Sequence, residues 1–178
     1  MYVSEQITTP PIEFKSGLHK AVYDTLKELN IDFVRVDTGE AITMEDCIDI
    51  SKVLECEVIK TLFLCNRQKT KFYLFVMPSD KPFVTKNFSK ALEISRVSFA
   101  PSELLFDMMG TPVGATTVFS TLLDTDCNVS VIIDEAVLSN EYYGCTDGTT
   151  TGYMRVKTDD VLNKFLPYTN HNAEIISI

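Results

Sequence analysis

Apolar side chains recur along this chain with helical spacing in some segments and with alternating spacing in others. The leucines and valines between residues 18 and 29 follow helical spacing, and Ser16 precedes them as a candidate N-cap. We therefore predict a helix in residues 16–30 and a strand in residues 31–38. Thr43 and Asp46 form a capping pattern at the start of a second predicted helix, residues 43–55.

The remaining segments continue this alternation of strands and helices. Residues 56–66 and 71–79 are apolar runs on either side of the basic turn RQKTK, which predicts a hairpin. Further helices are expected in residues 84–93, 101–109 and 158–166, the last with Thr158 as its N-cap. Further strands are expected in residues 96–100, from 128 onward, and in residues 150–157. Because the order contains no regular βαβ repeat, it predicts an α+β domain around a mixed sheet.

Length and composition favour a single domain. A chain of 178 residues that is 45% hydrophobic can bury one substantial core. We expect an N-terminal extension in residues 1–13, a domain in residues 14–168 and a C-terminal tail in residues 169–178. The polar N-terminus does not resemble a signal peptide, and no apolar run reaches membrane-spanning length, so a cytoplasmic protein is expected.

Cysteine and histidine usage narrows the possible chemistry. The five cysteines are odd in number and contain no CxxC pair, which fits reduced thiols and no metal site. His19 and His171 are the only histidines, and both are expected on the surface. A Ser-His-Asp triad or Cys-His dyad would therefore lack a histidine positioned as the general base. No P-loop or GxGxxG motif follows a strand, which leaves no case for a nucleotide cofactor.

The net charge of −9 is distributed unevenly. Residues 52–96 contain nine basic and four acidic side chains, a balance of +5, so the rest of the chain carries −14. A basic region on an acidic body can hold a polyanion at one place while the body repels it elsewhere. The alternative interpretation is that each of these lysines is only a solvated surface residue.

Lys60 interrupts an apolar strand, VIKTLFL, in which alternation places it on the same face as Val58 and Leu62. A buried ammonium needs a partner or a cleft, because an isolated buried charge costs several kcal/mol. Either Lys60 serves a site, or it lies on an edge strand and extends to water.

The stretch GTPVGATTVF, residues 110–119, admits two interpretations. Gly110 and Gly114 suit a tight turn after a helix, with Gly110 as a left-handed cap. Glycine also lets backbone N–H groups approach a polar ligand closely, as in a cradle.

Taken together, VIKTLFL, the hairpin, RVSFA, GTPVGATTVFSTLLD, VSVIIDEAVL and DDVLNKFL resemble, in sequence and in order, the YbaK/ProX family of aminoacyl-tRNA deacylases. The resemblance covers residues 16–167 and is strongest to the ProX branch. It implies a mostly antiparallel, partly barrel-like sheet surrounded by helices, with no cofactor. It also implies hydrolysis of mischarged tRNA(Pro), chiefly Ala-tRNA(Pro), with Cys-tRNA(Pro) as the alternative.

The resemblance assigns roles to particular residues. Lys60 occupies the position of the lysine on which the function of this family depends most, and it is the expected catalytic residue. The glycine loop favours the cradle interpretation, and the substrate is expected to contact Gly110, Thr111, Gly114, Ala115, Thr116, Thr117, Gly144 and Cys145. Val113 and Val118 stand where the family has prolines, and Cys145 stands near the usual place of a histidine.

Partners follow from the same resemblance. The acceptor end of tRNA(Pro) is expected to meet Arg67, Lys69, Lys71, Lys81 and Lys86, and prolyl-tRNA synthetase is a further candidate partner; neither membrane nor DNA is expected. Two other classes of function remain open at this point. One is a non-catalytic module that binds tRNA or a synthetase, and the other is a domain that senses a free amino acid.

Overall fold

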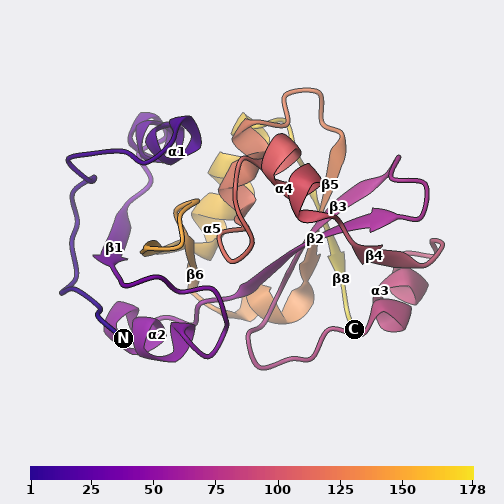
Figure 1. The fold of residues 1–178 in the computed structure, drawn as a ribbon, viewed down its shortest axis with the longest axis horizontal. Coiled ribbons are helices and arrows are strands. Elements are labelled where there is room, and N and C mark those ends of the chain that lie inside the picture. The colour runs from indigo at the N-terminus through magenta and orange to yellow at the C-terminus, as the bar shows by residue number, and fades with distance from the viewer.

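The computed structural model describes residues 1–178, which form two β-sheets flanked by helices (Figure 1). The larger sheet has five strands in the order β4-β2-β3-β5-β8, and the smaller has three in the order β1-β7-β6. Four of the six strand pairings are antiparallel, and neither sheet closes on itself. The α+β class with a mixed sheet is confirmed, and the sheets do not form a closed barrel.

The five-stranded sheet is built around the predicted hairpin. Strands β2 (Lys60–Asn66) and β3 (Phe72–Met77) pair antiparallel, and β4 (Val97–Phe99) adds to the outer edge of β2. Strands β5 (Val129–Asp134) and β8 (Ala173–Ile176) continue the sheet in parallel beyond β3.

The three-stranded sheet joins segments from the two ends of the chain. Strand β7 (Gly152–Lys157) lies between β1 (Phe33–Asp37) and β6 (Tyr142–Thr146), and both pairings are antiparallel. Along the outer edge of β1, Val3 and Ile7 form isolated antiparallel bridges, so the segment expected as an N-terminal extension lies against this sheet.

Helices cover both sheets. Helix α1 (Gly17–Glu28) begins after Ser16, whose hydroxyl accepts a hydrogen bond from the His19 N–H as the predicted N-cap. The next helices along the chain are α2 (Cys47–Leu54), α3 (Thr85–Ala91) and α4 (Ser102–Met109). Two 3₁₀ turns follow, Val118–Leu122 and Glu135–Ser139, and the final helix runs through α5 (Thr158–Asp160), a π-helical turn (Val161–Phe165) and α6 (Leu166–Tyr168). None of these helices is both long and apolar enough to cross a bilayer.

The main core lies where α1 meets both sheets. It contains 19 buried apolar residues, contributed by α1, β3, β5, β6, β7 and the final helix. The two sheets are also joined through their backbones, because Val58 and Gly144 form a parallel bridge and the Ile59 N–H donates to the Gly144 carbonyl at 3.0 Å. This bridge fixes the start of β2 against β6.

Several segments differ from the sequence expectations. Residues 142–146, for which the sequence predicted no strand, form β6, and the expected C-terminal tail contains β8, which completes the edge of the larger sheet. Thr158 is not an N-cap, because its hydroxyl donates to the Asn140 carbonyl instead.

Both histidines are buried, contrary to the expectation that they lie on the surface. His19 is 3% exposed and His171 is 4% exposed. Each ring lies 3.0 Å from a buried carboxylate, Asp147 for His19 and Asp124 for His171. A buried imidazole needs partners for its polar atoms, and these carboxylates come from segments far away in the sequence.

Candidate active site

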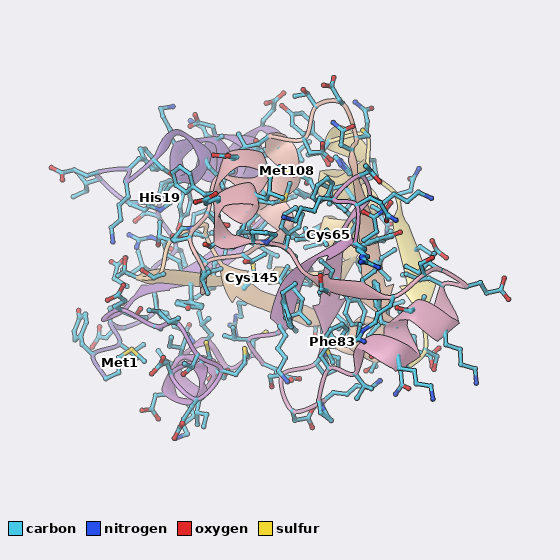
Figure 2. The ribbon with its side chains drawn as sticks, turned by 45° about the vertical axis from the view of Figure 1, so that its right-hand side comes forward. Met1, His19, Cys65, Phe83, Met108 and Cys145 are labelled. Carbon is cyan, nitrogen blue, oxygen red and sulfur yellow. The ribbon has the colours of Figure 1, made fainter.

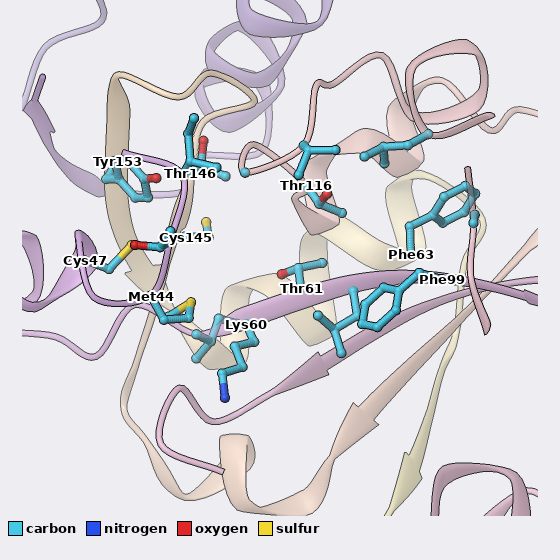
Figure 3. A pocket seen from close by; sticks show the side chains of 18 residues that line it. Met44, Cys47, Lys60, Thr61, Phe63, Phe99, Thr116, Cys145, Thr146 and Tyr153 are labelled. Atoms are coloured by element: carbon cyan, nitrogen blue, oxygen red, sulfur yellow. The ribbon is translucent and has the colours of Figure 1, made fainter. Parts of the chain in front are cut away.

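A cavity of about 500 Å³ lies between the two sheets, beside the bridge that joins Val58 and Gly144. Its walls come from residues 42–47, the first half of β2, the β4–α4 connection, the loop at residues 113–116, and strands β6 and β7. Figure 3 shows Cys47 and Tyr153 on one wall and Phe63 and Phe99 on the opposite wall. Twelve of the 18 residues in the wall are hydrophobic, which suits a ligand with an apolar part.

Lys60 contributes the only charged side chain to this wall. Its stem lines the cavity, while its ammonium donates a hydrogen bond to the Lys81 carbonyl at 2.6 Å and points away from Thr61 and Thr116 (Figure 3). No carboxylate pairs with Lys60, so its positive charge remains uncompensated beside the cavity.

The glycine loop reaches the cavity through Gly114 and Thr116. Gly114 has φ +90°, and a Cβ at this position would lie 2.9 Å from the Ile42 Cα, so only glycine fits here without a shift of backbone. The backbone N–H groups of Gly114 and Thr116 make no hydrogen bond within the protein. Two amide donors are therefore available at the cavity wall.

The other residues predicted for this part of the site lie outside the wall. Gly110 has φ +68° and caps α4, and a Cβ there would lie 2.5 Å from a Leu123 methyl carbon. Thr111 and Ala115 are fully buried and do not line the cavity, and Thr117 is the N-cap of the Val118–Leu122 turn. For these positions the structure favours the turn interpretation over direct ligand contact.

On β6, Cys145 lines the cavity and Gly144 does not. A Cβ at Gly144 would lie 2.4 Å from the Glu57 carbonyl oxygen, so this glycine permits the close approach of the two sheets. Gly144 therefore acts on the site through the backbone that it holds in place.

The two cysteine thiols of the wall are poor nucleophiles. Burial raises the pKa of Cys145 well above its ordinary value, and a hydrogen bond with Thr117 only partly opposes this shift. Burial also raises the pKa of Cys47. Since the thiolate is the reactive form, neither sulfur is prepared for covalent catalysis at neutral pH.

Replacing Cys145 with serine should therefore leave turnover within about fivefold of the original rate, because only the size and polarity of the wall change. Steady-state deacylation measures this effect, and iodoacetamide labelling of the unmodified protein should modify the exposed Cys127 before Cys145. Complete loss of activity in a folded Cys145→Ser protein would instead assign the thiol a direct chemical role.

The five predicted tRNA contacts fall into three places. Arg67, Lys69 and Lys71 are exposed on the β2–β3 turn, at the far end of β2 from Lys60 and about 20 Å away by strand geometry. Lys81 is bound to the buried Asp134 at 2.6 Å, so its charge is already paired. Lys86 is exposed on α3 and lines a second groove.

Sequence reasoning missed one complete wall of the cavity. Thr43, Met44, Cys47 and Tyr153 lie together there, although they come from the start of α2 and from β7. The only local signal was the Thr43–Asp46 capping pattern, which the structure contains as reciprocal hydrogen bonds.

No three His, Cys, Asp or Glu side chains gather closely enough to coordinate a metal ion.

Comparisons with known proteins agree with this architecture. The family described as an aminoacyl-tRNA editing domain matches residues 38–164. Prolyl-tRNA synthetase associated domain-containing protein 1 of Danio rerio is 26% identical over 162 residues, which cover 90% of this chain and 87% of that protein. Prolyl-tRNA editing protein ProX of Acetoanaerobium sticklandii is 28% identical over 118 residues, which cover 65% and 71%.

Solved structures support the fold alone. The crystal structure of hypothetical protein APE2540 has a TM-score of 0.68 at 18% identity, covering 88% of this chain and 99% of that one. A candidate trans-editing enzyme for prolyl tRNA synthetase has a TM-score of 0.65 at 13% identity, covering 92% and 98%.

Proposed function

Because this chain belongs to the aminoacyl-tRNA editing domain family and is an aminoacyl-tRNA deacylase, we propose that it hydrolyses mischarged tRNA(Pro), chiefly Ala-tRNA(Pro). The observation that carries the proposal is the cavity wall, in which one ammonium without a carboxylate partner and two amides without an internal hydrogen bond adjoin an apolar space. Family membership favours hydrolysis over the two non-catalytic alternatives, a tRNA-binding or synthetase-binding module and an amino-acid sensor.

The reaction needs electrostatic stabilisation more than a strong base. When water attacks the ester carbonyl, negative charge develops on the carbonyl oxygen, and preformed donors stabilise it. The Lys60 ammonium and the amides of Gly114 and Thr116 are the donors that this wall offers. For Lys60 to take part, its ammonium exchanges the Lys81 carbonyl for an oxygen of the substrate.

The wall contains no histidine, aspartate or glutamate that could accept the proton of the attacking water. We propose that a free hydroxyl of the terminal ribose orients this water. The water proton then passes to the ribose oxygen that leaves when the ester bond breaks, so the products are the free amino acid and the intact tRNA. This assignment places one of the reacting groups on the substrate.

Acyl-group selection is proposed to be steric. An alanyl or cysteinyl side chain suits the space beside Met44, Cys47 and Cys145, whereas a prolyl ring has to fit against the same wall. Overlap with a rigid wall rejects a larger group more strongly than the loss of one methylene, which is worth only about 1–3 kcal/mol.

The partners proposed for this activity are tRNA(Pro) and prolyl-tRNA synthetase, the enzyme named in two of the relatives' descriptions. Arg67, Lys69 and Lys71 are proposed to attract tRNA phosphates from the β2–β3 turn. Their distance from Lys60 assigns them to association and not to the chemical step.

A deacylation panel of Ala-, Cys-, Ser- and Pro-tRNA(Pro) tests the proposal. We expect release of alanine to be fastest, with kcat/KM for Pro-tRNA(Pro) lower by at least about 10²-fold because a steric clash acts on the transition state. Faster hydrolysis of Cys-tRNA(Pro) would select the alternative substrate. Comparable hydrolysis of all four esters would contradict steric selection by the cavity.

A further inference from the structure

A second groove, of about 550 Å³, lies between α3 and β4 and belongs to no part of the proposed catalytic machinery. Its lining residues are Phe83, Val84, Thr85, Lys86, Ser89 and Arg96. Figure 2 labels Phe83 next to the ribbon of α3, on the side of the molecule away from His19. Two of its lining residues are cations, and none is an acid.

The charges of this groove are uncompensated. Lys86 and Arg96 are both exposed, and neither forms an ion pair with any carboxylate of the protein. Two unpaired cations that line one recess suit an anion with several acceptor oxygens, because arginine and lysine both bind phosphate.

A buried hydroxyl also points to a ligand. Ser89 is only 8% exposed, yet its Oγ has no hydrogen-bond partner in the protein and lies at the groove. Buried polar atoms are nearly always paired, so an unpaired hydroxyl in a groove that two cations line suggests that a bound group normally supplies the partner.

The groove adjoins the catalytic cavity through a pair of aromatic rings. Phe83 lines the groove, Phe99 lines the cavity, and their ring centroids are 5.8 Å apart in an edge-to-face arrangement. Phe99 is 61% exposed, which leaves ring surface free at the mouth of the cavity. A ligand that leaves the cavity over Phe99 therefore reaches Lys86 and Arg96 next.

We propose that this groove binds phosphate groups of the single-stranded 3′ end of the aminoacyl-tRNA, while Phe99 stacks on its terminal base. The inference rests on the proposed function and adds the direction in which the RNA leaves the site. Stacking platforms beside cationic grooves are the common means of holding single-stranded nucleic acid without reading its sequence. The RNA chain then runs from the cavity toward α3, and the β2–β3 turn is left to more distant phosphates.

Two esters of the same terminal nucleoside, one without and one with phosphate groups, test the groove. One is the alanyl ester of adenosine, which has no phosphate, and the other is the alanyl ester of the trinucleotide CCA. The unmodified protein should hydrolyse the CCA ester with at least about tenfold higher kcat/KM, since both esters carry the terminal base but only the CCA ester can add phosphate contacts in the groove. The Lys86→Ser/Arg96→Ser double variant should lose this gain and keep its activity on the adenosine ester.

Salt dependence supplies a second readout. Each phosphate contact to a single strand contributes about 0.7 to the slope of log affinity against log salt, so the double variant should lower that slope by roughly 1.4. The matched control is Lys27→Ser/Lys157→Ser, which removes the same charge from exposed lysines elsewhere and should leave the slope unchanged. Ser89→Ala should weaken CCA binding several-fold, and Phe99→Leu about tenfold.

The outcomes separate this inference from the proposed function. Binding of unacylated CCA, followed by calorimetry or anisotropy, tests the groove even where no ester is hydrolysed. Three results would contradict phosphate binding in the groove. The double variant could lose equal activity on both esters, or its salt slope could stay unchanged. The Lys27/Lys157 control could also change as much as the double variant. Loss of the proposed function alone would appear as failure to hydrolyse either ester with CCA binding intact.

Discussion

Replacing Lys60 with alanine is expected to lower kcat/KM for aminoacyl-tRNA by about 10²–10³-fold, the effect of removing one donor from a developing oxyanion. The reason is local, because Lys60 is the only charged side chain in the cavity wall and its ammonium is bound to a carbonyl and not to a carboxylate. The free energy of unfolding should change little, since no buried ion pair is broken. Single-turnover deacylation and thermal unfolding of the same samples measure the two effects.

Lys60→Met is the matched control, because methionine keeps much of the apolar stem and removes the charge. If the ammonium acts on the substrate, the Met and Ala variants should be equally inactive and both should unfold near the original Tm. Activity that returns in Lys60→Met would show that the stem matters and the charge does not. Near-original turnover in both variants would remove Lys60 from the mechanism.

Asp147 carries the largest expected effect on stability. The residue is 2% exposed, and its carboxylate accepts hydrogen bonds from the His19 ring, the Tyr23 hydroxyl and both the N–H and the hydroxyl of Thr149. Asp147→Asn replaces one acceptor oxygen with an NH₂ group and should cost about 3 kcal/mol, as expected when one partner of a buried pair is removed. For a chain of this length the Tm should fall by roughly 6–12 °C.

The pH dependence of this effect has a defined sign. Burial raises the pKa of Asp147, but the hydrogen bond and charge of His19, with the bonds from Thr149 and Tyr23, outweigh burial and lower it overall. A carboxylate with a depressed folded pKa stabilises the protein fully above the ordinary aspartate pKa of about 3.9 and loses this contribution as pH falls through the folded pKa. The Tm difference between the original protein and Asp147→Asn should therefore shrink below about pH 4.

Tyr23→Phe is the control for this prediction, because it removes one donor to Asp147 and keeps the ring in the core. Its cost should be near 1 kcal/mol, the usual net value of a single hydrogen bond. If Asp147→Asn unfolds at the same temperature as Tyr23→Phe, the carboxylate charge contributes nothing beyond one hydrogen bond.

The local parts of the fold were predictable from sequence because their causes are local. The Ser16 cap, the hairpin around RQKTK and the left-handed Gly110 all follow from turn and capping preferences within a few residues. Strand β6 was missed because YYGCT is short and contains glycine, so its pairing with β7 decides its conformation.

In the candidate site, too, local features were predictable from the sequence and features that depend on distant segments were not. The sequence indicated Lys60, Gly114, Thr116 and Cys145, which all line the cavity. It also extended the proposed contacts to Gly110, Thr111, Ala115 and Thr117, which do not line the cavity, because a loop presents only part of its length to a neighbouring space. The opposite wall could not be found from local pattern, because Met44 and Tyr153 meet there only after β1 pairs with β7.

The bridge between Val58 and Gly144 has a consequence for how this protein is made. Its partners lie far apart in the chain, and the cavity wall itself extends from residue 42 to residue 153. Contacts of such long range form after local ones, because the intervening chain must first be ordered. A nascent chain still attached to the ribosome therefore has its hairpin and α1 segments available for folding but no catalytic cavity. Because Tyr153 of β7 is part of the wall, the complete cavity can form only after synthesis has passed β7.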